Sequence, residues 1–375
     1  MGGHCVVFDT IMDFDQDAWD RCFPGEIENW AYYRAVEEAG IPGFSWRYVA
    51  ILNGGKPIAA IPAFLTAYRL DTTVQGGLKR VTERLARRFP ALLSIPLLCV
   101  GSPVTEVCQF GFAPEVAGDD KPGLLAALMN HLKDYARRHR IGLIAVKDAR
   151  DRDVPLLGPA VAGFARMAGL PTASLPLPFK TLDAYLASLS SATRKDMRRK
   201  MRVQDTIRVE WRDRIDDVLD QVAALYEETE GRSDLQFEHL PPAYFANVLR
   251  LLAGRARCVL YWRDRDLLAF NLVLESPDRL VDKFIGTGAL ARNYNLYFLS
   301  WMENVRHCLA AGIPLYQSGQ AGYAVKVRLG SRLSLNWNYF RHTNPLLNAV
   351  LRGVARLVRL DRFDPEIRLA MGGAK

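Results

Sequence analysis

One order of predicted elements occurs twice in this chain and constrains its fold more than any other feature. In the first half, two strand-like runs at 46–52 and 57–65 flank Asn53-Gly54-Gly55, a strong hairpin turn. In the second half, similar runs at 256–262 and 267–274 flank a turn of four charged residues. A third strand, a long amphipathic helix and a buried strand follow each hairpin. The repeat therefore predicts two lobes of the same α/β topology.

A proline-rich segment separates the two patterns, so we place the lobes at 1–175 and 176–375. That segment, 169–179, contains three prolines and is expected to cross between the lobes as an extended linker. A basic helix at 190–203 follows it. The C-terminal run 346–358 has apolar residues on one helix face. We expect it to pack on the body of the protein, with contact to a membrane surface as the alternative.

The composition is that of an ordinary globular protein, with 375 residues, 49% hydrophobic and 24% charged. A net charge of +8 is compatible with an anionic partner but does not require one. The six cysteines have no metal-ligand spacing and are typical of reduced thiols, so we expect no metal site. We expect no signal peptide and no membrane span, and therefore a cytoplasmic protein. The sequence does not indicate an oligomeric state.

The segment from 280 to 330 has the pattern strand, glycine turn, helix, strand. Its first strand, 280–285, ends at Gly286-Thr287-Gly288, and a helical pattern follows. Such a turn and helix N-terminus can hold an anion through free backbone amides. Asn293 and Asn295 open the helix where a phosphate would lie, although asparagine is also a common helix N-cap.

Two basic helices are predicted, a short one at 77–90 and a more strongly charged one around 194–202. The second contains six basic residues in nine positions. At about 100° per residue, five of these cations share an arc of about 140°. Either the arc is a solvated helix face, or an anion relieves the repulsion among its charges. The five cations are Arg194, Lys195, Arg198, Arg199 and Arg202.

Four segments together resemble FemAB-like members of the GNAT acyltransferase superfamily. They read LSSATRKDMRRKMR, CVLYWRDRDLLAFNLVL, HCLAAGIPLYQSG and GYAVKVRLG, within residues 180–340. The resemblance implies an α/β (α+β) fold of two pseudo-symmetric lobes, each a mixed, mostly antiparallel sheet flanked by helices. It also implies a degenerate first lobe. The family's phosphate loop, Gln/Arg-x-x-Gly-x-Gly/Ala, is replaced here by GTGALARNYN.

The resemblance and the residue types together suggest site residues. Lys326, in GYAVKVRLG, matches a lysine of the FemAB-like proteins that could stabilise an oxyanion or a donor phosphate. Tyr316 and Tyr323 flank the same turn and are either proton donors to the leaving group or core tyrosines. Glu228 and Glu230 end a helix and are candidate general bases, or solvated carboxylates. For the donor, the candidate contacts are Gly286, Thr287, Gly288, Asn293, Asn295, Arg194 and Arg198.

Three functions remain open at this point. The first is an N-acyltransferase that moves an acyl group from acyl-CoA to a primary amine of a small molecule or amino-acid-like acceptor, with no permanently bound cofactor. The second is an aminoacyltransferase of FemAB type that uses aminoacyl-tRNA. The third is a GNAT-like protein that binds an anion without catalysis. In each case we expect the site near Gly286, Tyr316 and Lys326, because the first lobe has a long glycine- and proline-rich loop instead of a tight turn.

Overall fold

The computed structural model describes residues 3–69, 94–232 and 237–357, which form two compact units. Unit 1 contains the described residues of 1–30, 42–170 and 335–357, and unit 2 contains 31–41 and 171–334. These bounds differ from the expected division at residue 175, because each unit includes a segment from the other half of the chain. The basic helix expected at 77–90 lies outside the described residues.

The sheet of unit 1 has the order β1-β2-β3-β4-β6-β15-β7, with β5 paired to β3. Every neighbouring pair is antiparallel except β4 and β6, which are parallel and joined through helix α5. The strands are β1 (His4–Phe8), β2 (Phe44–Asn53), β3 (Lys56–Arg69), β4 (Ser94–Val100), β5 (Gly111–Phe112), β6 (Leu143–Arg150), β7 (Ala165–Ala168) and β15 (Asn336–His342).

The sheet of unit 2 has the order β14-β8-β13-β12-β11-β10-β9. Its one parallel pair among the described strands is β12 and β13, which helix α11 joins. The strands are β8 (Thr172–Pro176), β9 (Arg208–Arg212), β10 (Ala256–Arg263), β11 (Asp266–Glu275), β12 (Leu280–Thr287), β13 (Leu315–Gln317) and β14 (Arg332–Ser334).

The two sheets have the same strand order and the same strand directions when they are followed from β1 and from β9. In this correspondence β4 matches β12, β6 matches β13 and α5 matches α11. The predicted repeat and the mixed, mostly antiparallel fold are confirmed. The expected linker 169–179 instead contains β8, which inserts between β13 and β14, while β15 inserts between β6 and β7. A proline at each end of a short strand does not prevent pairing, which explains the difference.

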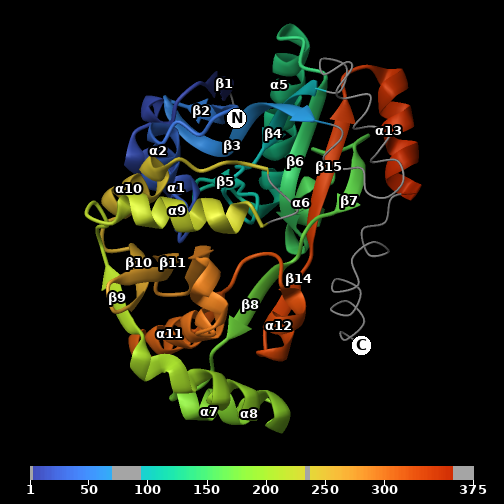
Figure 1. The fold of residues 1–375 in the computed structure, drawn as a ribbon. Helices are drawn as coiled ribbons and strands as arrows, with labels where there is room; N and C mark the ends of the chain where they lie inside the picture. Colours follow the sequence, from blue (N-terminus) through green and yellow to red (C-terminus); the bar gives the residue numbers. More distant parts are fainter. Residues whose placement is uncertain (1–2, 70–93, 233–236, 358–375) are drawn as a thin grey trace, which may run out of the picture. The chain divides into compact units, whose positions relative to one another are not determined.

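The helices of unit 2 cover both faces of its sheet. Figure 1 shows α9 on one side of β10 and β11 and α11 on the other. The helices counted with this unit are α2 (Trp30–Glu38), α7 (Leu182–Ser188), α8 (Ser191–Lys200), α9 (Leu219–Glu230), α10 (Pro242–Leu251), α11 (Leu296–Ala311) and α12 (Tyr323–Arg328), with short 3-10 turns η5 (Met201–Thr206) and η6 (Ala289–Arg292).

Fewer helices are described in unit 1 than in unit 2. They are α1 (Gln16–Cys22), α5 (Lys121–Arg138), α6 (Val154–Leu157) and α13 (Pro345–Leu357), with 3-10 turns η1 (Ile11–Asp13), η3 (Gly118–Asp120) and η4 (Asp151–Asp153). Among the helices of the described ranges, none is long and apolar enough to cross a membrane.

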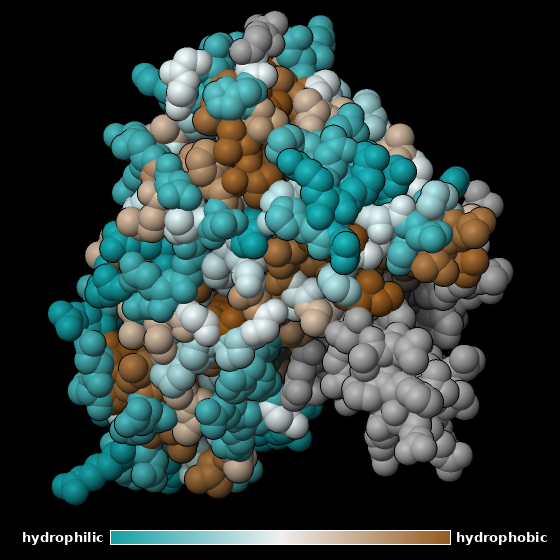
Figure 2. All heavy atoms as spheres, turned by 90° about the horizontal axis from the view of Figure 1, so that it is seen from above, coloured by the Kyte–Doolittle hydropathy of each residue, from teal (hydrophilic) through white to brown (hydrophobic). Residues whose placement is uncertain are grey.

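The apolar face of helix α13 is packed along one edge and exposed over the rest. Leu351 packs against the core cluster around Phe64, so the predicted packing on the body is confirmed. Leu346, Leu347 and Val350 point outward and are 79%, 53% and 63% exposed. In Figure 2 hydrophobic side chains gather at the right of the view, on the side where Figure 1 places α13. Contact of this face with a membrane surface stays a prediction.

Candidate active site

In unit 2 the parallel strands β12 and β13 separate early. They pair at only two positions, Leu280 with Tyr316 and Val281 with Gln317, whereas β12 stays paired with β11 as far as Thr287. After β13 the chain follows β8, since the Ser318 amide donates to the Ala173 carbonyl at 2.9 Å. Within the described residues, β12 therefore has no strand partner on this side from residue 282 onward. We call residues 282–287 the β12 edge.

Lys326 holds the chain in place where it leaves β12. Its side chain is buried, and Nζ donates to the carbonyls of Ser318, Gly319 and Gln320 at 2.5, 3.0 and 3.3 Å. An ammonium has three hydrogens to donate, and a buried cation needs such partners. The predicted site residue is thus neither a surface lysine nor turned toward solvent. Its geometry is that of a residue that fixes the loop after β13.

Asp282 is the first residue of the β12 edge and accepts hydrogen bonds from three side chains. Asn271 Nδ2 donates to its two oxygens at 2.9 and 3.1 Å, Asn304 Nδ2 donates at 3.2 Å, and the Tyr316 hydroxyl donates at 2.9 Å. The residue keeps some contact with solvent. Burial raises the pKa of Asp282 to about 6, against the hydrogen bonds from Asn271 and Tyr316 and the charge of Lys326.

A β-bulge turns Asp282 away from its neighbours on β12. The register places Phe284 opposite Leu272 and Asp282 opposite Val273, so Lys283 is the extra residue. Phe284 consequently packs on the rings of α9 and α10, while Asp282 faces Asn304 on α11. The bulge separates a polar position from the apolar packing next to it.

Three polar atoms on the same side of the sheet have no hydrogen-bond partner among the residues that the structure describes. They are Oδ1 of Asn271, Oδ1 of Asn304 and the hydroxyl of Tyr261, and all three side chains are 0% exposed. Burial raises the pKa of Tyr261, and the negative charge of Asp282 raises it further. Buried polar atoms nearly always have a partner, so this cluster is unusual.

The turn after β12 is built by internal contacts. An added Cβ at Gly286 would lie 2.1 Å from the Phe270 ring, which is why glycine is needed there. The Thr287 amide donates to Thr229 Oγ1 at 2.7 Å, and the Gly288 amide donates to the Leu268 carbonyl at 2.9 Å. The expectation of free amides is therefore wrong for these two residues, since a neighbouring strand and helix α9 already accept from them.

Asn293 and Asn295 lie between η6 and α11, as expected. Asn295 has a left-handed backbone, with φ of 51°, and its side chain makes no capping hydrogen bond. Asparagine adopts this conformation more easily than most residues, which explains its presence without a capping role. Asn293 ends η6.

The remaining predicted residues are dispersed. Glu228 forms an ion pair with Arg232 at 3.4 Å and lies against Gly288, where an added Cβ would be 3.6 Å from its Oε2. Glu230 instead contacts His239 Nδ1 at 2.7 Å. The Tyr323 hydroxyl donates to the Pro171 carbonyl at 2.9 Å, which matches a core tyrosine. Of the predicted catalytic residues, only Tyr316 touches Asp282.

Met197 of α8 and Met201 of the following turn η5 point into the core, and most cations of these two elements are exposed to solvent. Met197 is 0% exposed and Met201 9%. Arg194 donates to the Ala187 carbonyl at 3.0 Å, and Arg199 pairs with Asp196 at 2.7 Å. The other three cations of the predicted arc, Lys195, Arg198 and Arg202, are exposed.

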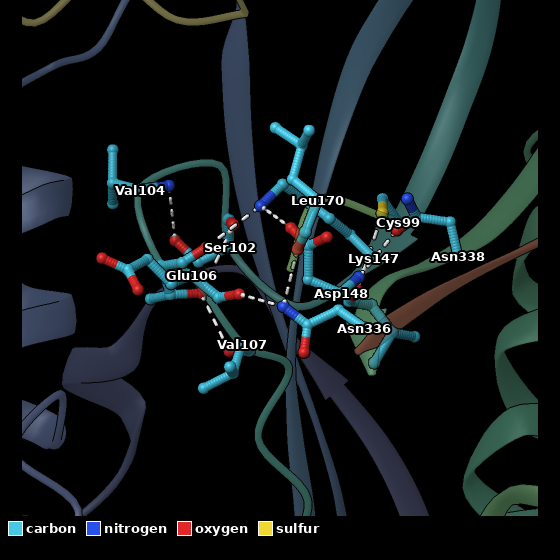
Figure 3. A network of polar contacts seen from close by, with 12 residues as sticks. Cys99, Ser102, Val104, Glu106, Val107, Lys147, Asp148, Leu170, Asn336 and Asn338 are labelled. Carbon is cyan, nitrogen blue, oxygen red and sulfur yellow. Dashed lines mark hydrogen bonds and ion pairs between the residues drawn. The ribbon is translucent and has the colours of Figure 1, made fainter. Parts of the chain in front are cut away.

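The counterpart of this region in unit 1 is filled by the chain itself. Strands β4 and β6 pair over four positions, up to Val100 at the end of β4. The following loop then folds back onto β6: the Cys108 amide donates to the Asp148 carbonyl at 2.9 Å, and Lys147 Nζ donates to the Thr105 carbonyl at 3.0 Å. Figure 3 shows Lys147 and Asp148 within the polar network of this loop. Unit 1 thus has a closed loop where unit 2 has a strand edge.

Sequence reasoning missed Asp282, Asn271, Asn304 and Tyr261. One signal was available, because an aspartate interrupts the otherwise strand-like run LVDKFIGT, and acidic residues are depleted in strands. Its partners lie on three separate elements, and no local pattern connects them.

The comparisons with known proteins concern both the domain and the whole chain. Residues 191–327 match the family model described as "Acetyltransferase (GNAT) domain". A curated relative, "Putative 8-amino-7-oxononanoate synthase 2" of Mycobacterium tuberculosis, is 22% identical over 337 residues, which are 85% of this chain and 43% of that protein. This chain therefore spans less than half the length of the curated relative.

Solved structures resemble the chain over nearly its whole length. FemX has a TM-score of 0.59 at 13% identity, covering 93% of this chain and 100% of FemX. A tandem GNAT protein from the clavulanic acid biosynthesis pathway has a TM-score of 0.52 at 14% identity, and the match covers 92% of this chain and 99% of that protein. The C-terminal domain of a putative lysylphosphatidylglycerol synthetase from Agrobacterium fabrum has a TM-score of 0.52 at 13% identity, and the match covers 89% of this chain and 94% of that domain. These likenesses confirm the predicted double-GNAT fold.

Proposed function

We propose that this protein is an acyltransferase that moves an acyl group from acyl-CoA to the primary amine of a small molecule or amino-acid-like acceptor. The match of residues 191–327 to the GNAT acetyltransferase domain supports this proposal. The reaction takes place in unit 2. The described residues of unit 1 supply the second GNAT-like fold and, in this proposal, do not bind the donor.

The observation that supports this proposal best is the separation of β12 from β13. Beyond Val281, β12 pairs with no further described strand on this side, and such an edge can accept an extended ligand much as it would accept an added strand. The amide-bearing arm of an acyl-CoA has such groups. At the corresponding place in unit 1, β4 is paired with β6 to its end and the loop after it is bound to β6.

The diphosphate of the donor needs cations or amides other than those of Thr287 and Gly288, which donate within the protein. Arg198 is exposed on α8 and is our first candidate, with Arg194 and the segment 293–295 as further contacts. Lys326 acts indirectly, by holding the loop after β13.

A second candidate donor is aminoacyl-tRNA. The exposed cations Lys195, Arg198 and Arg202 favour it, and so does the likeness of the fold to FemX. We rank acyl-CoA first because the exposed cations of α8 and of the turn η5 after it lie on one short stretch of chain, which suits a small anion better than an extended nucleic-acid backbone.

Amide hydrogen exchange in the presence and absence of CoA tests the donor site. We expect CoA to slow exchange in peptides that cover 282–296 and to leave peptides covering 94–109 unchanged, so that unit 1 acts as an internal control. Release of free CoA from acetyl-CoA with a panel of primary amines tests the reaction. No protection at 282–296, together with protection in unit 1, would overturn the assignment.

A further inference from the structure

We propose that Asp282 and the buried acceptor atoms of Asn271, Asn304 and Tyr261 form the site that binds the amino group of the acyl acceptor and receives its proton. This inference rests on the proposed function and specifies the acceptor side of the same reaction. None of the four residues was among the sequence-predicted site residues.

The orientation of the two amides is fixed by the carboxylate. Asn271 and Asn304 each direct Nδ2 to Asp282, at 2.9 and 3.2 Å, because an ionised carboxylate can only accept hydrogen bonds. Asn304 Nδ2 also donates to the Tyr316 hydroxyl at 3.1 Å. Rotating either amide would place its oxygen against the carboxylate. Each Oδ1 is therefore left to accept from something outside the described side chains.

The unsatisfied groups select for a donor-rich, positively charged ligand. Two amide oxygens can only accept, the Tyr261 hydroxyl can accept, and Asp282 is negative when ionised. A primary ammonium brings three N–H donors and a positive charge. A hydroxyl brings one donor and no charge, and an anion would be repelled. The chemistry of the cluster therefore favours an amine over an alcohol or a phosphate.

The acid–base properties of Asp282 suit deprotonation of that amine. Its pKa of about 6, raised by burial, leaves it ionised near neutral pH yet more basic than an ordinary aspartate. The titratable groups that face it are Tyr261 on β10, Tyr316 on β13, Tyr297 on α11 and Lys326 on α12. Burial raises the pKa of all three tyrosines, so they stay protonated and Asp282 titrates alone in this range.

Acyl transfer to the amine bound at Asp282 releases free CoA and one proton. The ammonium gives one proton to Asp282, and the nitrogen lone pair then forms a C–N bond to the thioester carbonyl carbon. The C–S bond breaks, and the electron pair leaves with the CoA sulfur. The second proton lost by the nitrogen ends on that sulfur, and Asp282 returns its own proton to solvent. The products are an amide, free CoA and one proton.

Methylammonium is a suitable probe, because it carries the proposed recognition group and requires no acyl donor. We would follow the carboxyl carbon of Asp282 by ¹³C NMR through a pH titration, assigning the signal with Asp282→Asn. Saturating methylammonium should lower the apparent pKa of Asp282 by about one unit or more, whereas methanol and sodium chloride at equal concentration should not. Asp278→Asn, an equal charge change at an exposed turn residue, should leave the effect intact.

An Asp282 pKa that is the same with methylammonium, methanol and sodium chloride would overturn the proposal. The methylammonium titration and the CoA-protection experiment test the amine site and the donor site separately. A methylammonium effect without CoA protection at 282–296 would refute the CoA donor and leave the amine site standing. CoA protection without a methylammonium effect would do the reverse.

Discussion

The hydroxyl of Tyr316 donates a hydrogen bond to Oδ2 of Asp282 at 2.9 Å. Asp282 directly follows Val281, the last residue of β12 that pairs with β13. This side-chain bond spans the two strands at the point where their backbones separate. Tyr316 was predicted to be either a proton donor to the leaving group or a core tyrosine. In the structure its proton is already directed at Asp282, so we assign it a positioning role.

Tyr316→Phe tests that role. Removing a donor to the ionised carboxylate should raise the pKa of Asp282 further and shift the acid limb of the pH–rate profile upward. Loss of one buried hydrogen bond should also cost about 1 kcal/mol of stability. A uniform loss of rate at every pH, with the limb unmoved, would instead mean that Tyr316 itself transfers the proton.

Asp282→Asn should raise stability near neutral pH although it lowers activity. The folded-state pKa of about 6 lies above the unfolded value, so the folded protein binds more protons between about pH 4 and pH 6. Stability contributed by this group is therefore present at acid pH and lost as pH rises through about 6. At pH 7.5 the asparagine variant should be more stable than wild type, by at most about 3 kcal/mol, and at pH 4 it should show no such gain. Urea unfolding at the two pH values measures the difference. A variant that is less stable at pH 7.5 would contradict the raised pKa.

Lys326→Met should reduce both stability and activity. The substitution leaves three loop carbonyls without their donor, and losing buried partners of a charged group costs on the order of 3 kcal/mol. Thermal unfolding and acetyl transfer should decline together. A variant with an unchanged melting temperature and no activity would restore Lys326 as a direct catalytic residue.

Gly286→Ala should be destabilising for a reason that a second substitution can relieve. The new Cβ would lie 2.1 Å from the Phe270 ring. Overpacking of this kind typically costs about 1–3 kcal/mol. Phe270→Leu, which removes the ring, should recover part of the loss in a double-mutant cycle. Additive effects of the two substitutions would show that the close contact is not the cause.

Salt dependence distinguishes the two donors. If α8 binds the diphosphate of CoA, Arg198→Glu should weaken CoA binding strongly, and wild-type affinity should depend weakly on salt. If it binds tRNA, the logarithm of affinity should fall with the logarithm of salt concentration by about 0.7 to 0.9 per phosphate contact. Arg265→Glu, at another exposed arginine of unit 2, is the matched control. Steep, salt-sensitive tRNA binding without CoA affinity would reverse our ranking.

The sequence allowed the repeated architecture to be predicted, because hairpins such as that around Asn53-Gly54-Gly55 have strong local signals. The exchange of β8 and β15 between the units could not be predicted. The sequence of one segment does not indicate which distant segment it will pair with. In addition, the prolines around β8 predicted a linker instead of a strand.

The predicted location of the site stays a prediction, and the structure adds residues to it that the sequence did not indicate. Gly286, Tyr316 and Lys326 lie in the expected region of unit 2, but each makes internal contacts that spacing could not reveal. Asp282 acquires its properties from Asn271, Asn304 and Tyr316, which the fold brings together from three elements. Lysine and tyrosine at a matching motif position looked catalytic, whereas an aspartate inside a strand did not.

The pH dependence of acetyl transfer to a primary amine at saturating acetyl-CoA tests the central claim most directly. For wild type and for Asp278→Asn, kcat/KM for the amine should fall about tenfold per pH unit below about pH 6. Asp282→Asn should reduce kcat/KM by about 10²- to 10⁴-fold near neutral pH and lose the acid limb, with CoA binding unchanged. Wild-type rates and an unchanged acid limb in Asp282→Asn would contradict the account.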